Sequence, residues 1–240
     1  MLKILSIPLF LLFFCFNIPL FAQQNPKKKD PVQPTEGIID IVSVNDIKAK
    51  MAEKFVSIQD YTADFQWING ENHYHGRIQY KKPDKILLTF EEPQDQKIVS
   101  NGDFLYIYIP YLKVVVQQLL LEDTESSILA TTSEEGLTRL FEEYSFSFYD
   151  TSTVQPYRNM RAYHLKLIQQ TPKVGFKKMD LWVAENGLIL QSTGYSPNGI
   201  NVSLIFSNIQ TNTEIPDYIF DFEVPTDAQI IRNIIVPFAD

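Results

Sequence analysis

Along most of the chain after residue 60, apolar side chains recur at every second position, and this period constrains the fold more than any other feature of the sequence. Successive side chains of a β-strand point to opposite faces of a sheet, so the alternation predicts strands with one buried face. Four Asn-Gly pairs, which favour tight hairpin turns, stand between the alternating segments: Asn69-Gly70, Asn101-Gly102, Asn186-Gly187 and Asn198-Gly199. The sequence therefore predicts a mostly antiparallel sheet built as a meander.

Two segments depart from the strand pattern. Apolar residues over 44–58 follow the spacing of an amphipathic helix, with Ser43 or Asn45 as its N-cap. Residues 125–143 are predicted to form one or two short helices inserted between strands, with Ser133 as a further N-cap. The fold class expected from these elements is α+β and mainly β.

The number of predicted strands also constrains the shape of the sheet. A sheet of some ten strands must curl or close, because flat open sheets of that size are uncommon. A curled sheet with few helices leaves an apolar concave face that must be covered or filled. The chain contains 2 Trp, 12 Tyr and 17 Phe, many of them on one parity of the strands, as expected for the lining of a cavity. A fully packed barrel core would give the same alternation, so both interpretations stay open at this point.

The N-terminal part of the chain has a different composition. Residues 1–22 combine a basic start with a long apolar run and a small residue, Ala22, before polar sequence, which predicts a signal peptide cleaved after Ala22. Residues 23–37 are rich in Pro and Lys and are predicted to form a disordered tether. The single cysteine, Cys15, lies in the leader and follows bulky residues, which disfavours an acylation site. A single folded domain is expected over 38–240.

Composition and motifs argue against several classes of function. A formal net charge of −8 disfavours a nucleic-acid binder, which would present a basic face to phosphates. No nucleophile elbow, zinc-protease helix motif or phosphate-binding glycine loop occurs in the sequence. His73 and His75 share one face of a strand and could hold a metal, but an exposed hairpin is the favoured interpretation. No catalytic residue, metal or cofactor is therefore expected.

A set of short segments carries a resemblance to a known family. These segments are Tyr61 to Phe65, Gly76 to Lys85, Glu92-Pro93, Ile98 to Gly102, Leu105 to Tyr108, Val183 to Leu188, Phe206 to Asn208 and Ile219 to Pro225. Each is weak alone, but their order and spacing over roughly residues 44 to 230 resemble the LolA family of periplasmic lipoprotein carriers.

The resemblance implies an incomplete, half-open antiparallel β-barrel, with an N-terminal helix and a helical lid. It implies a cavity for the acyl chains of lipoproteins or another lipid cargo, an inner-membrane complex that releases the cargo and an acceptor at the outer membrane. The chain is expected to act as a monomer. Family carriers have an arginine before the proline that matches Pro83, and this arginine helps to hold the lid closed. Lys82 stands at that position and is the candidate lid latch; it lacks the planar fork of arginine.

Candidate site residues follow from the resemblance and from the apolar side chains that alternate onto one face of each strand. This alternation alone does not identify which face is concave. The expected cavity residues are Phe65, Trp67, Leu88, Phe90, Tyr106, Tyr108, Phe146, Phe148 and Leu204. The expected lid residues are Leu129, Leu137, Leu140 and Phe141.

Two other functions compete with the carrier hypothesis. The first is a LolA-like lipid-binding or envelope-stress sensor domain that acts through a protein partner. The second is a lipid hydrolase that uses His73 or His75, which is disfavoured because no arrangement of nucleophile and base is found.

Overall fold

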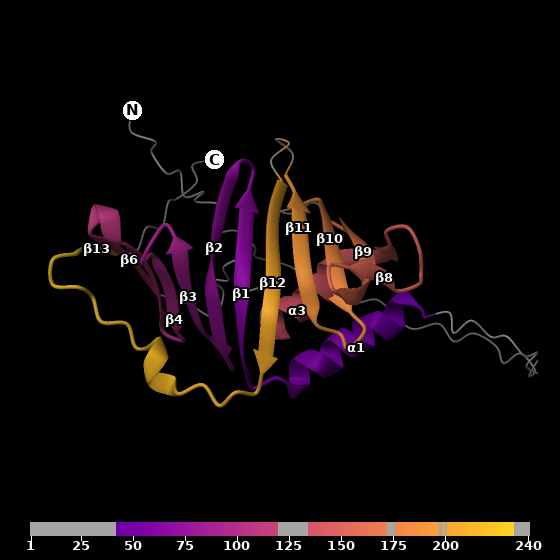
Figure 1. The fold of residues 1–240 in the computed structure, drawn as a ribbon, viewed down its shortest axis with the longest axis horizontal. Helices are drawn as coiled ribbons and strands as arrows, with labels where there is room; N and C mark the ends of the chain where they lie inside the picture. The colour runs from indigo at the N-terminus through magenta and orange to yellow at the C-terminus, as the bar shows by residue number, and fades with distance from the viewer. Residues whose placement is uncertain (1–41, 120–133, 172–175, 197–198, 200, 233–240) are drawn as a thin grey trace, which may run out of the picture.

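The structure, a computed structural model, describes residues 42–119, 134–171, 176–196, 199 and 201–232. The predicted signal peptide, the predicted tether and the predicted helical residues 125–133 lie outside these residues. A single sheet of thirteen strands dominates the described part of the chain, in the order β13-β6-β5-β4-β3-β2-β1-β12-β11-β10-β9-β7, with β8 paired to β9 (Figure 1). Its two ends do not pair with each other, so the barrel stays incomplete.

The strands have the following bounds. The first half of the sheet contains β1 (Asp60–Asn69), β2 (Asn72–Lys81), β3 (Lys85–Glu92), β4 (Lys97–Asn101), β5 (Phe104–Ile109) and β6 (Val114–Leu119). The second half contains β7 (Tyr144–Phe148), β8 (Gln155–Tyr157), β9 (Met160–Gln169), β10 (Lys178–Ala184), β11 (Ile189–Tyr195) and β12 (Asn201–Thr211). The last strand is β13 (Gln229–Arg232).

The predicted meander is confirmed. The strand pairs β1–β2, β4–β5, β10–β11 and β11–β12 are all antiparallel and are joined at the four Asn-Gly pairs. Gly70 and Gly102 have φ of 59° and 99°, in the region that glycine adopts without strain. Some pairings depart from the meander: β1 pairs with β12 and β7 with β9, both antiparallel, and β13 adds to β6 in parallel.

The helix α1 (Val44–Ser57) forms as predicted from its apolar spacing. Its N-cap is Ser43, whose hydroxyl accepts a hydrogen bond from the amide of Asp46, while the Asp46 carboxylate accepts one from the amide of Ser43. This capping box satisfies amides that a helix start otherwise leaves unpaired. The buried face of α1 carries Ile47, Met51 and Phe55.

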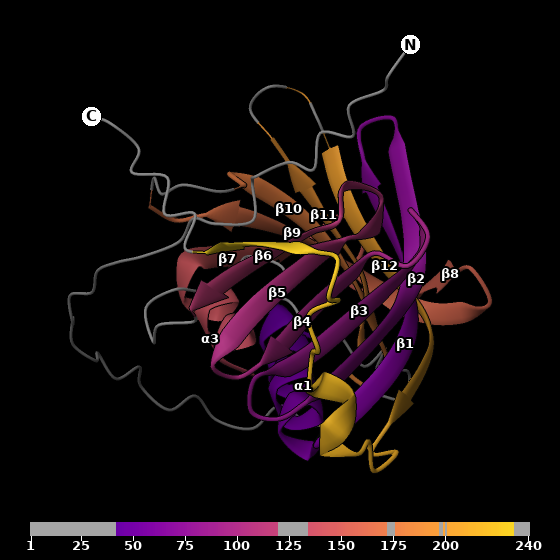
Figure 2. The ribbon, with the colours of Figure 1, turned by 90° about the vertical axis from the view of Figure 1, so that its left-hand side faces the viewer.

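A second helix, α3 (Glu134–Glu143), precedes β7 and falls within the predicted insertion. Both helices lie on the inner side of the curved sheet (Figure 2). There they share one hydrophobic cluster with β7, β9 and β10, which includes Met51, Leu140, Leu165 and Leu181. No helix among the described residues is both long and apolar enough to cross a membrane.

After β12 the chain continues as an arm along the outer side of the sheet, residues 212–232, here called the C-terminal arm (Figure 2). It contains the short helix η2 (Asp217–Phe220), in which Phe220 is fully buried, and it ends in β13. The Phe222 ring contacts the rings of Tyr106 and Tyr108, with centroids 5.1 and 6.1 Å apart. Asp217 forms ion pairs with Lys81 and Lys85.

Candidate binding face

One apolar face runs continuously around the inside of the curved sheet, and we call it the concave face. Residues paired across antiparallel strands share a face, so the register identifies its members. Phe65 pairs with Phe206, and Trp67 pairs with Leu204, which carries the face from β1 to β12. The pairing of Leu204 with Ser192 continues it into β11. The face therefore extends across the middle of the sheet without a change of side.

Seven of the nine expected cavity residues lie on the concave face. Phe65, Leu88 and Phe90 are at most 2% exposed and belong to one hydrophobic cluster, against which Trp67 and Leu204 pack. Phe146 and Phe148 pack against the cluster that contains α1 and α3. The expected residues are thus brought to one face, but they are distributed over two clusters.

The other two expected cavity residues, Tyr106 and Tyr108, lie on the opposite face of the sheet, and the expectation is corrected here. Tyr106 pairs with Val99, whose neighbour in β4, Ile98, is the partner of Leu88. Adjacent residues of a strand point to opposite faces, so Tyr106 faces away from the concave face. Tyr108, two residues further along β5, points to the same side as Tyr106. Both rings are covered from outside by the C-terminal arm.

An aromatic group stands on the concave face toward the β1–β2 hairpin, at the end of the face away from the last turn of α1. It consists of Trp67, Tyr74 and Phe90, whose ring centroids are 5.9 to 6.5 Å apart. Burial raises the pKa of the Tyr74 hydroxyl, with a smaller contribution from the nearby Tyr111. The hydroxyl is neutral near pH 7, as a tyrosine hydroxyl ordinarily is, and can donate a hydrogen bond.

The lid residues within the described part of the chain pack against the helix-covered half of the face. Leu137 and Leu140 are 3% and 6% exposed. The Phe141 ring meets the Phe146 ring edge-on, with centroids 5.5 Å apart, and the ammonium of Lys48 lies 4.8 and 5.0 Å from these two centroids. This arrangement connects α1, α3 and β7. Leu129 lies outside the described residues.

Lys82, the candidate latch, contacts the last turn of α1. Its Nζ donates a hydrogen bond to the backbone oxygen of Val56, at 3.2 Å. The carbonyls of a final helical turn have no partner within the helix, so they are natural acceptors for such an ammonium. The neighbouring Lys81 instead donates to the backbone oxygen of Ile215 in the C-terminal arm, at 2.8 Å.

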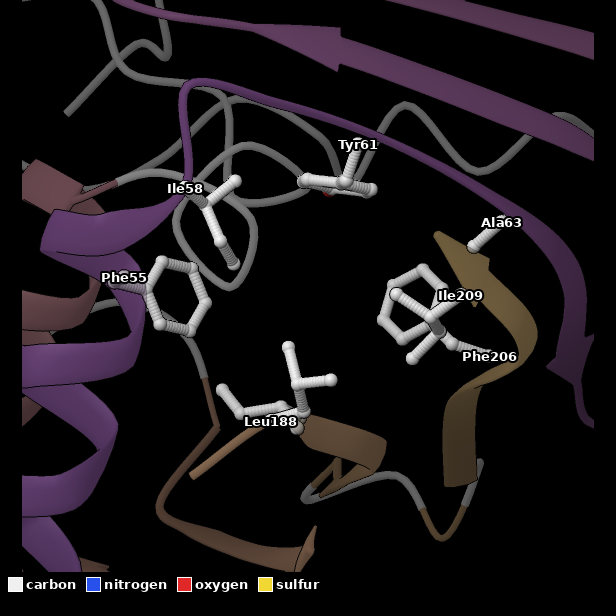
Figure 3. A pocket seen from close by; sticks show the side chains of 8 residues that line it. Phe55, Ile58, Tyr61, Ala63, Leu188, Phe206 and Ile209 are labelled. Atoms are coloured by element: carbon white, nitrogen blue, oxygen red, sulfur yellow. The ribbon is translucent and has the colours of Figure 1, made fainter. Parts of the chain in front are cut away.

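A small pocket opens where α1 meets the sheet (Figure 3). Its volume of about 30 Å³ matches a water molecule or two, so it cannot hold an acyl chain in this arrangement. The pocket is lined only by apolar or aromatic side chains: Phe55, Ile58, Tyr61, Ala63, Leu188, Ile189, Phe206 and Ile209.

None of these lining residues is among the sequence-predicted cavity residues. Phe206 shares its strand parity with Leu204, and Leu188 directly follows an Asn-Gly pair. The sequence thus shows that Phe206 shares a strand face with Leu204 and that Leu188 follows a turn. Only the packing of α1 shows that these two segments meet at one pocket.

The described histidines do not form a metal site. His73 is exposed, and His75 Nε2 lies 3.3 Å from a carboxylate oxygen of Glu91. Among the described residues no group of three or more His, Cys, Asp or Glu side chains is arranged to hold a metal ion.

The third histidine, His164, lies on the outer face of the sheet between two aromatic rings. Its ring stacks on Tyr149 and on Trp182, with both centroids 4.2 Å away. Burial lowers the pKa of His164, although the nearby Asp180 carboxylate acts in the opposite direction. Asp180 itself accepts a 2.5 Å hydrogen bond from the Tyr195 hydroxyl.

The chain is similar in sequence to a family of known proteins. Residues 57–223 match the family profile described as outer membrane lipoprotein carrier protein LolA. Curated proteins named "Outer-membrane lipoprotein carrier protein" are similar over most of their length. The one from Actinobacillus succinogenes is 22% identical over 191 residues, covering 78% of this chain and 84% of its own. The one from Chromohalobacter salexigens is 27% identical over 192 residues, covering 77% and 86%.

The fold is also similar to solved structures. An uncharacterized conserved protein from Thermus thermophilus superposes with a TM-score of 0.54 at 15% identity, covering 79% of this chain and 98% of that one. MucB superposes with a TM-score of 0.50 at 13% identity, covering 75% of this chain and 62% of its own. At these identities the likeness concerns the fold alone.

Proposed function

This chain belongs to the LolA family of outer-membrane lipoprotein carrier proteins, and on that premise we propose that its concave face receives the acyl chains of lipoproteins. The family is one of transport proteins, so the chain is a carrier and not an enzyme. Its cargo is lipoprotein, as the family implies. Family carriers are periplasmic, and the leader over 1–22 with cleavage after Ala22 is the proposed route of export.

The observation that carries the proposal is the continuous and largely apolar surface inside an open sheet. Each CH₂ group kept from water is worth about 0.8 kcal/mol, so exposing a sixteen-carbon chain costs on the order of 12 kcal/mol. An acylated protein therefore cannot cross an aqueous compartment with its chains bare. A concave face that includes Phe65, Leu88 and Phe206 offers the apolar surroundings that remove this cost.

Loading requires the elements over the concave face to move. The pocket at α1 has a volume of about 30 Å³, far below that of an acyl chain. Phe55 of α1 and Phe206 of β12 line opposite sides of this pocket, so displacement of α1 would open the face (Figure 3). A cargo that binds only the opened arrangement shifts the population toward it, and release follows when the closed arrangement is restored.

Lys82 is proposed as one of the groups that hold the closed arrangement, because it bonds to the end of α1. The finer partners remain those expected from the resemblance, an inner-membrane complex that releases cargo and an outer-membrane acceptor. The segment 23–37 is proposed as a tether that separates the carrier domain from the leader.

The test is a release assay with the mature chain. Membranes that carry an acylated lipoprotein are incubated with the protein, and the lipoprotein in the soluble fraction is measured. We expect a soluble one-to-one complex to form. A charge on the concave face, Leu88→Glu, should abolish it, whereas the same change at the exposed Leu112, Leu112→Glu, should not.

The cargo itself supplies a second control, a lipoprotein whose acylated cysteine is replaced by serine. This protein is not expected to bind. Equal binding of the acylated and unacylated forms, or absence of any soluble complex with a folded carrier, would contradict the proposal.

A further inference from the structure

Gln96 is one of the buried polar side chains on the largely apolar concave face, together with Ser100 and Ser192. The amide of Phe90 donates a 2.9 Å hydrogen bond to the backbone oxygen of Gln96, which extends the β3–β4 ladder by one pair. Paired residues share a face, so the side chain of Gln96 lies on the same face as Phe90. Gln96 is only 5% exposed. A carboxamide is therefore buried among apolar neighbours.

This carboxamide is incompletely satisfied. The Oε1 atom of Gln96 is fully buried and has no hydrogen-bond partner among the described residues. Buried polar atoms are nearly always bonded, because an unpaired one loses its hydration without compensation. Ser100, a buried polar residue of the following strand β4, follows the rule and donates to the backbone oxygen of Asp84 at 2.9 Å. Gln96 thus has a buried acceptor that no described residue bonds and that a ligand can use.

The position of Gln96 relates it to the proposed cargo. It adjoins Phe90 and hence the aromatic group, toward the β1–β2 hairpin, whereas the apolar pocket lies at the other end of the face beside Tyr61. Six residue steps along β1 separate Tyr61 from Trp67, or about 20 Å at ~3.3 Å a step. One leaflet of a ~30 Å hydrocarbon core is shorter, about 15 Å. An acyl chain laid along the strands would fit between the two ends.

We propose that Gln96 recognises the amide that links an acyl chain to the N-terminal cysteine of the cargo, with the chain directed toward the pocket. This inference rests on the proposed carrier function. An amide offers an N–H, which can donate to the free Oε1, whereas an ester linkage has no hydrogen to donate. Gln96 therefore selects N-acylated cargo and sets the direction in which its chains enter.

The test compares two synthetic lipopeptides that differ by one hydrogen-bond donor. Both carry an S-diacylglyceryl, N-acyl cysteine, and in the second the amide nitrogen is methylated. Binding of each is measured for the wild-type protein, for Gln96→Met, which keeps the side-chain length, and for Gln94→Met. Gln94 is exposed in the same β3–β4 turn and serves as the matched control.

We expect the wild-type protein and Gln94→Met to prefer the unmethylated lipopeptide by about threefold to tenfold, as for one buried hydrogen bond. Gln96→Met should bind both lipopeptides equally, so that the double-mutant cycle assigns the preference to Gln96. Without ligand, Gln96→Met should melt at the same temperature as the wild type or higher, because the variant no longer buries an unpaired acceptor.

Two results would overturn the inference. The first is an undiminished preference in Gln96→Met. The second is a lower melting temperature of Gln96→Met together with an equal loss of affinity for both lipopeptides, which would indicate a purely structural role. Failure of the carrier function is a different outcome, because in that case the wild-type protein would bind neither lipopeptide.

Discussion

The ammonium of Lys82 lies 3.2 Å from the backbone oxygen of Val56 and donates a hydrogen bond to it. The contact joins the turn after β2 to the last turn of α1, across the end of the concave face where the pocket opens. A single flexible side chain thus connects the wall of the sheet to the helix that covers it. The contact is partly exposed, so it can break and re-form without unfolding the sheet.

Replacing Lys82 by methionine should loosen the end of α1. The lost hydrogen bond is worth roughly 0.5–1.5 kcal/mol, which leaves the fold intact but favours helix displacement. Hydrogen exchange should accelerate in the last turn of α1 and remain unchanged in β9 and β10. Lys82→Arg should retain protection, because guanidinium also donates to carbonyls. Lys177→Met is the control, since Lys177 is exposed. Equally faster hydrogen exchange in Lys177→Met would show that the change in α1 does not depend on the hydrogen bond between Lys82 and Val56.

Gly187 should tolerate no side chain, because α1 lies against it. A Cβ there would approach the backbone oxygen of Lys50 to 2.4 Å, and the residue has φ of +87°. Gly199 has a similar φ of +82°, but a Cβ would meet nothing within 4 Å. Gly199→Ala should therefore cost only the backbone strain, about 1–3 kcal/mol. Gly187→Ala should cost a further ~1–3 kcal/mol from overpacking, as measured by denaturant unfolding.

The same pair of variants tests how firmly α1 is seated. If Gly187→Ala and Gly199→Ala destabilise the protein equally, then α1 yields without cost, and the helix is looser than its packing indicates. Unequal destabilisation supports a helix that closely contacts the β10–β11 turn.

The stability of the protein should decrease as the pH falls below neutrality, in part because of His164. Burial lowers its pKa below the ordinary value of 6.5, so the unfolded chain binds a proton more readily than the folded one. The stabilisation is present above pH 6.5 and is lost as the pH falls through the lower pKa of the folded state. The charges of Asp180 and Asp150 oppose this shift, and the charge of Lys178 reinforces it.

His164→Phe isolates this contribution, because phenylalanine keeps the stacking between Tyr149 and Trp182 but does not titrate. Urea unfolding from about pH 7.5 to about pH 5 should show a smaller loss of stability in this variant than in the wild type. His73→Gln, at an exposed histidine, should follow the wild-type profile. Parallel profiles for the wild type and His164→Phe would refute the assignment.

The C-terminal arm should detach when Asp60 is changed. The Asp60 carboxylate accepts hydrogen bonds from the amide and hydroxyl of Thr213, at 2.7 and 2.9 Å, and from the amide of Ile215 at 3.4 Å. Hydrogen bonds to a charged group contribute about 1.5–3 kcal/mol, so Asp60→Ala should make the arm susceptible to proteolysis before the sheet unfolds. Asp103→Ala, at an exposed turn, is the control. Cleavage at equal rates in both variants would contradict this role.

The hairpins and helices of this fold could be predicted because their signals are local. An Asn-Gly pair, an alternating strand or a capping residue acts within a few positions, and Ser43 and the four turns are found where the sequence indicates. The choice of face is not local. The sequence of β5 is Phe-Leu-Tyr-Ile-Tyr-Ile, with apolar or aromatic side chains on both faces of the strand. Nothing within β5 therefore shows which face is concave.

The error at Tyr106 and Tyr108 has a specific physical origin in the C-terminal arm. The arm brings Phe222 over these rings from a distant part of the chain, and so provides an apolar environment on the outer face. The pocket was not predicted for the same reason, because only tertiary packing brings Phe55 and Phe206 to the same pocket. Interactions distant in sequence, and not weak local patterns, limit the prediction here.

The parallel pairing of β13 with β6 has a consequence for the behaviour of the protein in solution. An open sheet ends in a row of unpaired amides and carbonyls, to which a strand of another molecule can add. The four residues of β13 occupy that row along Val114 to Gln117, so the longer β6 is no longer the edge and the shorter β13 takes its place. A carrier must keep an apolar interior accessible while it travels through water, and it is therefore exposed to self-association more than most proteins. β13 is itself the outermost strand of the sheet, but it has only four residues, and a very short edge strand gives another molecule little backbone to pair with.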